Sequence, residues 1–349
     1  MSTTGRYSVV HVRRAWYVLC ESSELRARPL KRALFDMPLA VFRGAGGEPV
    51  ALVDRCAHRN VPISAGRVVH GEIECPYHGW RFDREGVCRN VPALVDDKGS
   101  SKARRVARYP TVERQGLVWA WGDPESDPAG VEPYVVPHLA DSRYGTVRYN
   151  ATFESTLHAT AENILDVPHT AFLHRGLFRG AGKRNVITAN LRRDAASVEA
   201  DYVGEPRPSG LIGKLLAPQG GTVRHVDRFM LPSIAQVEYA LGDSSHVLIT
   251  NLLTPVSDFV TTMFAIVSYR LPIGGKLVGR ILEPLAKRVV QQDAEVLAEQ
   301  TRNVKAFGGE RFVSTDVDLL GAHILRLLKH AERGETQEAG ELGSVRLEV

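Results

Sequence analysis

Two short segments, CAH and CPYH, constrain this chain more than any other part of it. Each places one thiol close to one imidazole: Cys56 with His58, and Cys75 with His78. In an extended segment, residues i and i+2 project to the same side, so Cys56 and His58 can converge on one centre. A tight turn at the proline and tyrosine of CPYH allows the same for the second pair. We therefore expect the chain to fold around a metal centre held by these four side chains.

The distribution of ligand types indicates which metal centre this is. Zinc fingers usually group cysteine with cysteine and histidine with histidine, whereas each segment here contributes one of each. The interleaving suits a two-iron cluster in which one iron takes both cysteines and the other both histidines, an arrangement whose neutral imidazoles raise the reduction potential. A zinc-stabilised binding protein is the alternative.

Further sequence around these segments is similar to a known family. CPYHGW and the later YPTVERQGLVWAWG resemble the Rieske domain of ring-hydroxylating oxygenase α subunits over about residues 8–122. The resemblance implies that Cys56, His58, Cys75 and His78 bind a Rieske [2Fe-2S] cluster. Cys20 and Cys88 match neither pair, and the loops lack the extra cysteine of respiratory-type Rieske proteins, which favours an oxygenase-type domain.

The organisation of the chain predicts two domains. Short β-type runs separated by turn signals such as GAGGEP and DREG fill the first part and predict a small antiparallel β domain. Residues 122–141 are dense in proline, glycine and acids, which predicts a linker. We therefore predict the α+β class, with a first domain at 1–121 and a second at 142–349. The resemblance implies a helix-grip (START/Bet v1-like) catalytic fold for the second domain.

Within the second domain, hydrophobic periodicity predicts a larger curved sheet between two helical regions. The predicted elements are a helix from 156 to about 173 interrupted at Pro168, a sheet from about 186 to 271, and helices at about 283–307 and 315–334. The last helix is expected to begin at a pair resembling a capping box, Thr315 and Asp318.

The segment ENILDVPHTAFLH forms a second constellation. Asp166 and His169 are one helical turn apart and share a face, but His174 is five residues further, roughly 140° around a regular helix. Pro168 gives a reason for the helix to break, because proline removes a backbone donor and clashes with the preceding turn. The break would let both histidines converge. Two histidines and a carboxylate on one face of an iron form the facial triad of non-heme Fe(II) oxygenases.

The spacing Asn163-x2-Asp166-x2-His169-x4-His174 looks like the catalytic motif of Rieske oxygenases, in the shorter variant common among monooxygenases and demethylases. The resemblance implies that His169 and His174 bind a mononuclear iron. It also implies that Asp166 bridges one of them to a cluster histidine, His78, of a neighbouring subunit in a homotrimer. On the residues alone, Asp166 in a helix salt bridge and Asn163 as a surface amide are the competing interpretations.

The third iron ligand is placed by resemblance in the helix near the C-terminus. The stretch QDAEVLAEQ is similar to the family's acid followed by VLxxQ, which points to Asp293, with Glu295 as the runner-up. As a helix acid, either residue could equally be a solvated surface group.

The resulting prediction is the terminal oxygenase of a Rieske non-heme iron system that hydroxylates or demethylates a hydrophobic aromatic or polycyclic substrate with dioxygen. The alternatives are a cis-dihydroxylating dioxygenase and a Rieske electron carrier with a binding-only C-terminal domain. No nicotinamide or flavin loop is found, so a separate NAD(P)H-dependent flavin reductase, with or without a ferredoxin, is expected to supply electrons.

Composition excludes several other classes. The chain has 44% hydrophobic and 24% charged residues and a formal charge of +4 without a long basic tract, so nucleic acid is not an expected partner. Without a secretory signal or a long apolar run, a cytoplasmic protein with no membrane span is expected. Apolar stretches near Leu211, Leu252 and Phe264 are candidates for the substrate wall.

Overall fold

The computed structural model describes residues 6–95, 103–174, 185–205, 223–242, 245–271 and 275–348. It divides the chain into two compact units. We call Val12–Val135 with Thr254–Ser257 the N-terminal unit, and the remainder, which includes Val136–Leu253 and Asp258–Val349, the C-terminal unit. The division after Val135 falls inside the proline-rich segment that was expected to be a linker.

Two short segments depart from the expected domain ranges. Residues up to His11 belong to the C-terminal unit, because the backbone N–H of Ser8 donates to the Glu310 carboxylate at 2.8 Å. Conversely, Thr254–Ser257 belongs to the N-terminal unit, where the Thr254 hydroxyl donates to the carbonyl oxygen of Val18 at 2.6 Å. Both contacts join residues more than 200 positions apart, which local sequence patterns do not reveal.

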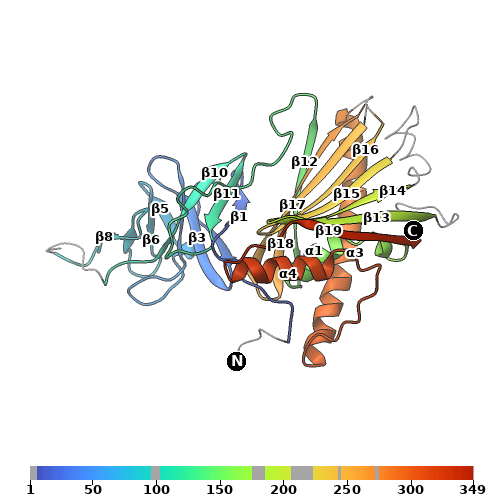
Figure 1. Ribbon diagram of the computed structural model, residues 1–349. Coiled ribbons are helices and arrows are strands. Elements are labelled where there is room, and N and C mark those ends of the chain that lie inside the picture. Colours follow the sequence, from blue (N-terminus) through green and yellow to red (C-terminus); the bar gives the residue numbers. More distant parts are fainter. Residues whose placement is uncertain are drawn as a thin grey trace. The chain divides into compact units, whose positions relative to one another are not determined.

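The N-terminal unit is built from three small sheets, with strand orders β1-β11-β10, β2-β3-β4-β9 and β5-β6-β7-β8 (Figure 1). Their strands are β1 Trp16–Glu21, β2 Leu30–Leu34, β3 Met37–Arg43, β4 Pro49–Val53, β5 Arg67–Val69, β6 Glu72–Glu74, β7 Arg81–Phe82, β8 Cys88–Asn90, β9 Arg108–Tyr109, β10 Thr111–Arg114 and β11 Leu117–Trp121. A 3-10 turn, η1 (Ile63–Ala65), follows the first Cys/His segment. The strands that pair in these sheets do so in antiparallel fashion, as the alternating sequence predicted.

Two apolar clusters fill the N-terminal unit. One contains Tyr17, Leu34 and Cys20, which is fully buried. The other contains Cys56 and Cys75 together with Ile63, Ile73, Phe82 and Cys88. The two candidate ligand cysteines therefore stand on a packed core, which restrains the loops that carry them.

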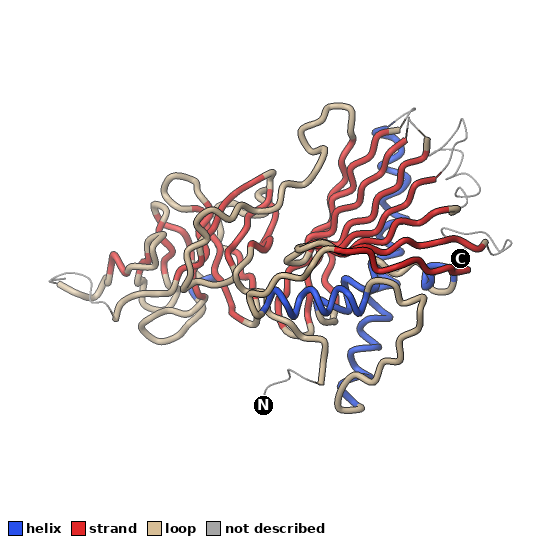
Figure 2. The backbone as a smooth tube through the Cα atoms, viewed as in Figure 1, coloured by secondary structure: helices blue, strands red, loops and turns tan. Residues whose placement is uncertain are grey.

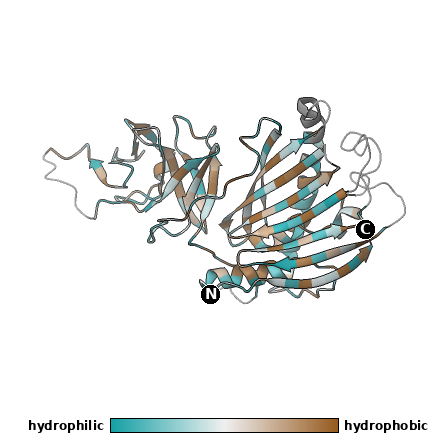
Figure 3. Ribbon diagram, turned by 45° about the horizontal axis from the view of Figure 1, so that its top comes forward, coloured by the Kyte–Doolittle hydropathy of each residue, from teal (hydrophilic) through white to brown (hydrophobic). Residues whose placement is uncertain are grey.

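The C-terminal unit is an eight-stranded sheet with the order β12-β18-β17-β16-β15-β14-β13-β19 (Figure 1). Its strands are β12 Gly145–Phe153, β13 Val186–Arg193, β14 Ser197–Val203, β15 Val223–Met230, β16 Ile234–Leu241, β17 Ser245–Ser257, β18 Val260–Arg270 and β19 Gly340–Glu348. Figure 3 shows hydrophobic and hydrophilic residues alternating along these strands, the pattern of a sheet whose two faces differ in environment. The predicted α+β class is confirmed.

The helices of this unit contact the sheet and one another (Figure 2). They are α1 Leu157–Ile164, η2 Pro168–Ala171, α3 Gly275–Ala306 and α4 Gly321–Glu332. Helix α3 packs along β12, α4 contacts β14, and α1 contacts both helices.

Two details of the C-terminal region differ from the sequence prediction. Helix α4 begins at Gly321 rather than at Thr315: the Thr315 hydroxyl does donate to the Asp318 carboxylate at 3.1 Å, but this pair closes a turn ahead of the helix. Strand β19, which the sequence did not predict, adds to the sheet beside β13. Its residues are mostly exposed, so it lacks the alternation that would mark a strand.

Candidate metal centres

The two Cys/His loops share one backbone hydrogen-bond pattern. The N–H of Cys56 and that of Cys75 each donate to the carbonyl oxygen five residues later, at 2.9 and 2.8 Å. Each cysteine carbonyl accepts from the N–H four residues later, at 3.0 Å in both loops. That fourth residue, Asn60 in one loop and Gly79 in the other, has a φ of 60° or 70°. The two matching loops therefore present the cysteines in equivalent backbone positions, whereas His58 stands two residues and His78 three residues after its cysteine.

The two cysteines belong to the second apolar cluster, and the two histidines lie next to each other. Cys56 and Cys75 are 1% and 2% exposed, whereas His58 is half-buried and His78 is exposed. The centroids of the two imidazoles are 4.5 Å apart, and the indole of Trp80 stacks on His58 at 4.7 Å with an interplanar angle of 1°. Thiols on the inside and imidazoles on the outside match the split ligation of a Rieske cluster.

Two side chains, one imidazole and one thiol, show that these residues fit such a cluster. The Nδ1 atom of His58 is buried and has no hydrogen-bond partner within the described part of the chain, which costs free energy unless something binds there. Burial raises the pKa of the Cys56 thiol to about 11, against the lowering effect of backbone N–H groups. A thiol in this position ionises at neutral pH only when a cation compensates. Bound iron meets both requirements.

The ENILDVPHTAFLH segment folds as two short elements rather than as one kinked helix. The Thr156 hydroxyl accepts from the N–H of Ala159 at 3.0 Å and caps α1, which ends at Ile164. Pro168 then opens η2, where a missing N–H does no harm because the first N–H groups of a helix have no partner within it. The predicted break is therefore present, but it begins before the proline.

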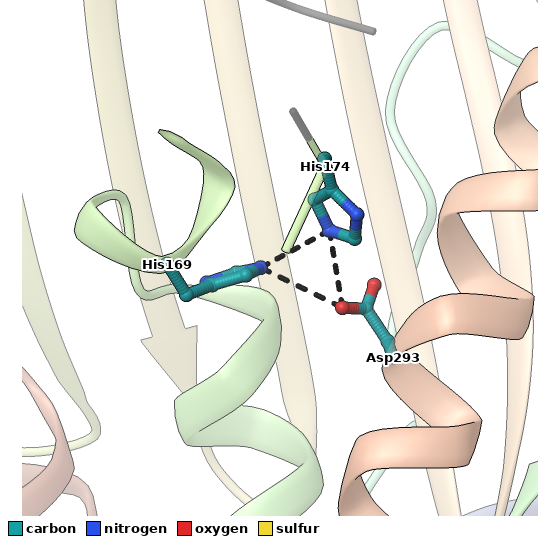
Figure 4. A group of neighbouring side chains, drawn as sticks. All are labelled: His169, His174 and Asp293. Atoms are coloured by element: carbon teal, nitrogen blue, oxygen red, sulfur yellow. Dashed lines mark hydrogen bonds and ion pairs between the residues drawn. The ribbon is translucent and has the colours of Figure 1, made fainter. Parts of the chain in front are cut away.

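Three side chains from three places in the sequence converge in the C-terminal unit (Figure 4). His169 lies in η2, His174 follows that turn, and Asp293 lies on α3. The Nε2 atoms of the two histidines are 3.2 Å apart. The Asp293 Oδ1 atom is 3.5 Å from Nε2 of His169 and 3.1 Å from Nε2 of His174. Ligand atoms at right angles around one ion, each about 2.1 Å from it, lie about 3 Å apart. The triangle is thus the right size for a single ion.

The chemistry of this group also suits a cation. Asp293 Oδ1 is buried, and no hydrogen bond to it is found among the described residues. Burial disfavours charge on His169, but Asp166 and Asp293 outweigh it and raise the pKa of His169 to about 9. The site therefore favours positive charge. Glu295, the other candidate for the third ligand, is exposed and accepts from Gln291 at 2.9 Å.

Each histidine of the triangle has a partner on its other ring nitrogen. The Nδ1 of His169 is 3.1 Å from Asp166 Oδ2, which also accepts from the His169 backbone N–H at 3.0 Å. The Nδ1 of His174 is 3.0 Å from Gln292 Oε1. Asn163, by contrast, is outside the triangle, and its buried Oδ1 has no hydrogen-bond partner within the described ranges.

The sequence did not single out a buried histidine on β15. The His225 ring nitrogens lie 2.7 Å from Glu205 Oε2 and 3.0 Å from Asp227 Oδ1, and its ring stacks between Tyr202 and Tyr239. Burial disfavours charge on this ring, but Asp227 and Glu205 outweigh it and raise the pKa of His225 to about 9. Its two carboxylates come from positions 20 behind and 2 ahead in the chain, a spacing with no recognisable motif. Gln292 was missed as well, although it directly precedes Asp293.

The structure does not place all of the apolar stretches that were expected to line a substrate pocket beside the triangle. Leu211 lies outside the described residues. Leu252 and Phe264 are 2% and 5% exposed. However, Phe264 pairs with Asn150, while the next pair along the strands is Ala265 with Tyr149. Side chains alternate between the two faces of a strand, so Phe264 lies on the opposite face from Tyr149. Tyr149 lies on the face of the triangle, because nearby Asp293, together with burial, raises the pKa of Tyr149 to about 12. Phe264 therefore faces away from the triangle.

Comparison with known proteins identifies both units. The Rieske [2Fe-2S] domain family matches residues 15–110, and the vanillate O-demethylase oxygenase C-terminal domain family matches residues 153–334. The second match alone spans more than half of the chain.

Individual relatives agree with these matches. The dicamba O-demethylase oxygenase component of Stenotrophomonas maltophilia is 37% identical over 167 residues, which are 47% of this chain and 48% of that protein. Methylxanthine N1-demethylase of Pseudomonas putida is 33% identical over 172 residues, 48% of each. The chain thus spans about half the length of these curated relatives.

A solved structure covers more of the chain. Dicamba monooxygenase bound to 3,6-dichlorosalicylic acid superposes with a TM-score of 0.79 and 27% identity, over 93% of this chain and 98% of that one. Within the described residues, no helix is both long and apolar enough to span a membrane.

Proposed function

The chain belongs to the family of the vanillate O-demethylase oxygenase C-terminal domain, here joined to a Rieske [2Fe-2S] domain, and on that premise we propose that it is the terminal oxygenase component of a Rieske system. The observation that carries this proposal is the His169, His174 and Asp293 triangle in a chain that also carries two matching Cys/His loops. An electron carrier alone does not need such a triangle, which argues against a binding-only C-terminal domain.

The residues of the chain have distinct roles in this proposal. Cys56, Cys75, His58 and His78 hold the [2Fe-2S] cluster. When bound, the cluster supplies electrons one at a time and a mononuclear Fe(II) supplies the place where dioxygen is activated. His169, His174 and Asp293 approach that place from one side and leave the other side open to dioxygen and substrate.

We assign Asp166 the connection between the two centres. One of its oxygen atoms accepts from both the backbone and the ring of His169, which fixes the orientation of the imidazole and leaves the other oxygen available. In a homotrimeric ring that oxygen would accept from His78 of the partner subunit. Asn163 is proposed only as a helper of Asp166, since its backbone carbonyl oxygen accepts from the N–H of Asp166 at 3.3 Å.

The proposed reaction is hydroxylation or oxidative demethylation of a hydrophobic aromatic or polycyclic substrate. The relatives are named as demethylases and monooxygenases, which favours this over cis-dihydroxylation. A separate NAD(P)H-dependent flavin reductase, with or without a ferredoxin, would supply the electrons. We propose a cytoplasmic location, where such a reductase and its nicotinamide are present.

A substrate screen tests the proposal. The purified protein, with a promiscuous reductase, is offered methoxylated and N-methylated aromatic compounds, and coupled consumption of dioxygen and NADH is recorded. We expect at least one compound to give a hydroxylated product that carries one atom of labelled dioxygen, or a demethylated product together with formaldehyde that carries this atom; the other oxygen atom leaves as water. Incorporation of both atoms into a diol would support the dioxygenase instead. Turnover that survives His174→Ala would contradict the oxygenase assignment.

A further inference from the structure

Consecutive residues of α3 contact the two nitrogens of one imidazole. Asp293 Oδ1 lies 3.1 Å from His174 Nε2, and the neighbouring Gln292 Oε1 lies 3.0 Å from His174 Nδ1. His174 itself is 1% exposed, so water does not readily replace either contact. Helix α3 therefore contacts both nitrogens of this ring, although residues 174 and 292 are 118 positions apart.

The chemistry of imidazole determines which atom donates and which accepts in the contact between His174 and Gln292. In a neutral ring, one nitrogen carries the proton and the other a lone pair. Nε2 faces the other two members of the triangle, so Nε2 must carry the lone pair when an ion is bound there. The proton is then on Nδ1, where the side-chain carbonyl of Gln292 accepts it. The opposite tautomer would aim an N–H at the ion and a lone pair at the carbonyl oxygen.

We propose that Gln292 is a positioning residue for the mononuclear iron, which it serves by holding His174 in the tautomer and orientation that present Nε2. This inference rests on the proposed iron site. Hydrogen-bond partners of metal-bound histidines commonly contribute 10–100-fold to metal affinity.

The two histidines have outer partners of different charge. Asp166, a carboxylate, faces His169, whereas the amide of Gln292 faces His174. With Asp293 as the second carboxylate, two negative charges surround a divalent ion, so the site is neutral overall. A neutral acceptor at position 292 thus orients the ring without adding a third negative charge to a buried site.

The test compares four proteins as purified full-length chains: wild type, Gln292→Met, Gln292→Glu and Gln291→Met. Methionine keeps the length of the side chain but removes the acceptor, and glutamate restores an acceptor. Gln291 is a matched control because it is the adjacent glutamine, is exposed, and donates to Glu295. Fe(II) affinity is measured by competition with a chelator, and the visible absorption of the cluster reports folding and loading in the same sample.

We expect Gln292→Met to bind Fe(II) 10–100-fold more weakly than wild type with unchanged cluster absorption. Gln292→Glu should bind Fe(II) more tightly than Gln292→Met because its carboxylate accepts from Nδ1, and Gln291→Met should match wild type. Wild-type affinity in Gln292→Met would overturn the inference. Equal weakening in Gln292→Glu would also overturn it, because the size of the side chain, not its acceptor, would then be the cause. Failure of the proposed function gives a different result: wild type and His174→Ala would bind iron equally poorly.

Discussion

At the scale of single residues, Asp293 is the proposed iron ligand whose replacement should be most informative. It is the only carboxylate within the three-residue group found among the described residues, and its Oδ1 has no other partner there. We predict that Asp293→Asn lowers the iron content from about three to about two atoms per chain, because the cluster has its own four ligands. Turnover should fall at least about 100-fold. Metal analysis and visible absorption of the purified variant provide the measurement.

Glu295→Gln is the matched control for Asp293→Asn. Glu295 is on the same helix, carries the same charge and is exposed, so its iron content and turnover should equal those of wild type. The opposite pattern, in which Glu295→Gln loses iron and Asp293→Asn keeps it, would show that the third ligand is Glu295 and not Asp293.

The sequence revealed these residues to different degrees for a physical reason. The Cys/His pairs, and likewise His169 and His174, are close in the chain, so their spacing alone predicts that they converge. Asp293 is 119 positions beyond His174, and only family resemblance pointed to it. Gln292 was not predicted, because its role follows from the direction of one carbonyl oxygen, and no spacing rule encodes that direction.

At the scale of elements, a row of charged side chains crosses five neighbouring strands of the large sheet. It runs from Arg192 on β13 through Glu199 on β14 and Arg228 on β15 to Glu238 on β16, and ends at His246 on β17. A hydrogen bond to His246, together with Arg228 and against the effect of burial, lowers the pKa of Glu238 to about 2. Cross-strand pairs of this kind hold strand register.

The lowered pKa of Glu238 predicts how stability depends on pH. Because the pKa is lower in the folded than in the unfolded state, the stabilisation is fully present above about pH 4.5 and is lost as the pH falls towards 2. We predict that Glu238→Gln lowers the Tm of the C-terminal unit by several degrees at pH 7, where the contribution is at most about 3 kcal/mol. Calorimetry should show this difference narrowing as the pH falls from 5 to 3.

An exposed ion pair on α3 provides the control for this prediction. Glu283 and Lys287 are 45% and 61% exposed, and exposed pairs contribute little to stability. Glu283→Gln should therefore leave Tm nearly unchanged at every pH. If both variants behaved alike, the row across the sheet would not stabilise the fold.

Element boundaries were predicted less well than element types. The sequence predicted the large sheet and both C-terminal helices, since each has a clear hydrophobic periodicity. It placed the start of the last helix at Thr315, because a hydrogen-bonded Thr315 and Asp318 pair looks the same in a turn as in a helix cap. Strand β19 could not be predicted, since an edge strand with mostly exposed residues has no hydrophobic pattern.

At the scale of the whole molecule, the chain has two units, each with one candidate metal centre built entirely from its own residues. The [2Fe-2S] ligands come from the N-terminal unit, and the triangle comes from the C-terminal unit. Each centre can therefore be disabled by one substitution that leaves the other intact. This independence allows the route of the electrons to be tested.

The proposed ring predicts that two inactive variants rescue each other. Cys75→Ser should disable the cluster, and His174→Ala should disable the mononuclear site, so each protein alone is inactive. If electrons pass from the cluster of one chain to the iron of the next, mixed trimers recover about a third of wild-type turnover, because one of their three junctions joins a chain with a cluster to a chain with an intact iron site. Turnover is measured with the substrate found in the screen, on mixed assemblies purified through two different tags. If electrons instead pass only within a chain, the mixed assemblies remain as inactive as each variant alone, and the bridge through Asp166 between subunits is ruled out.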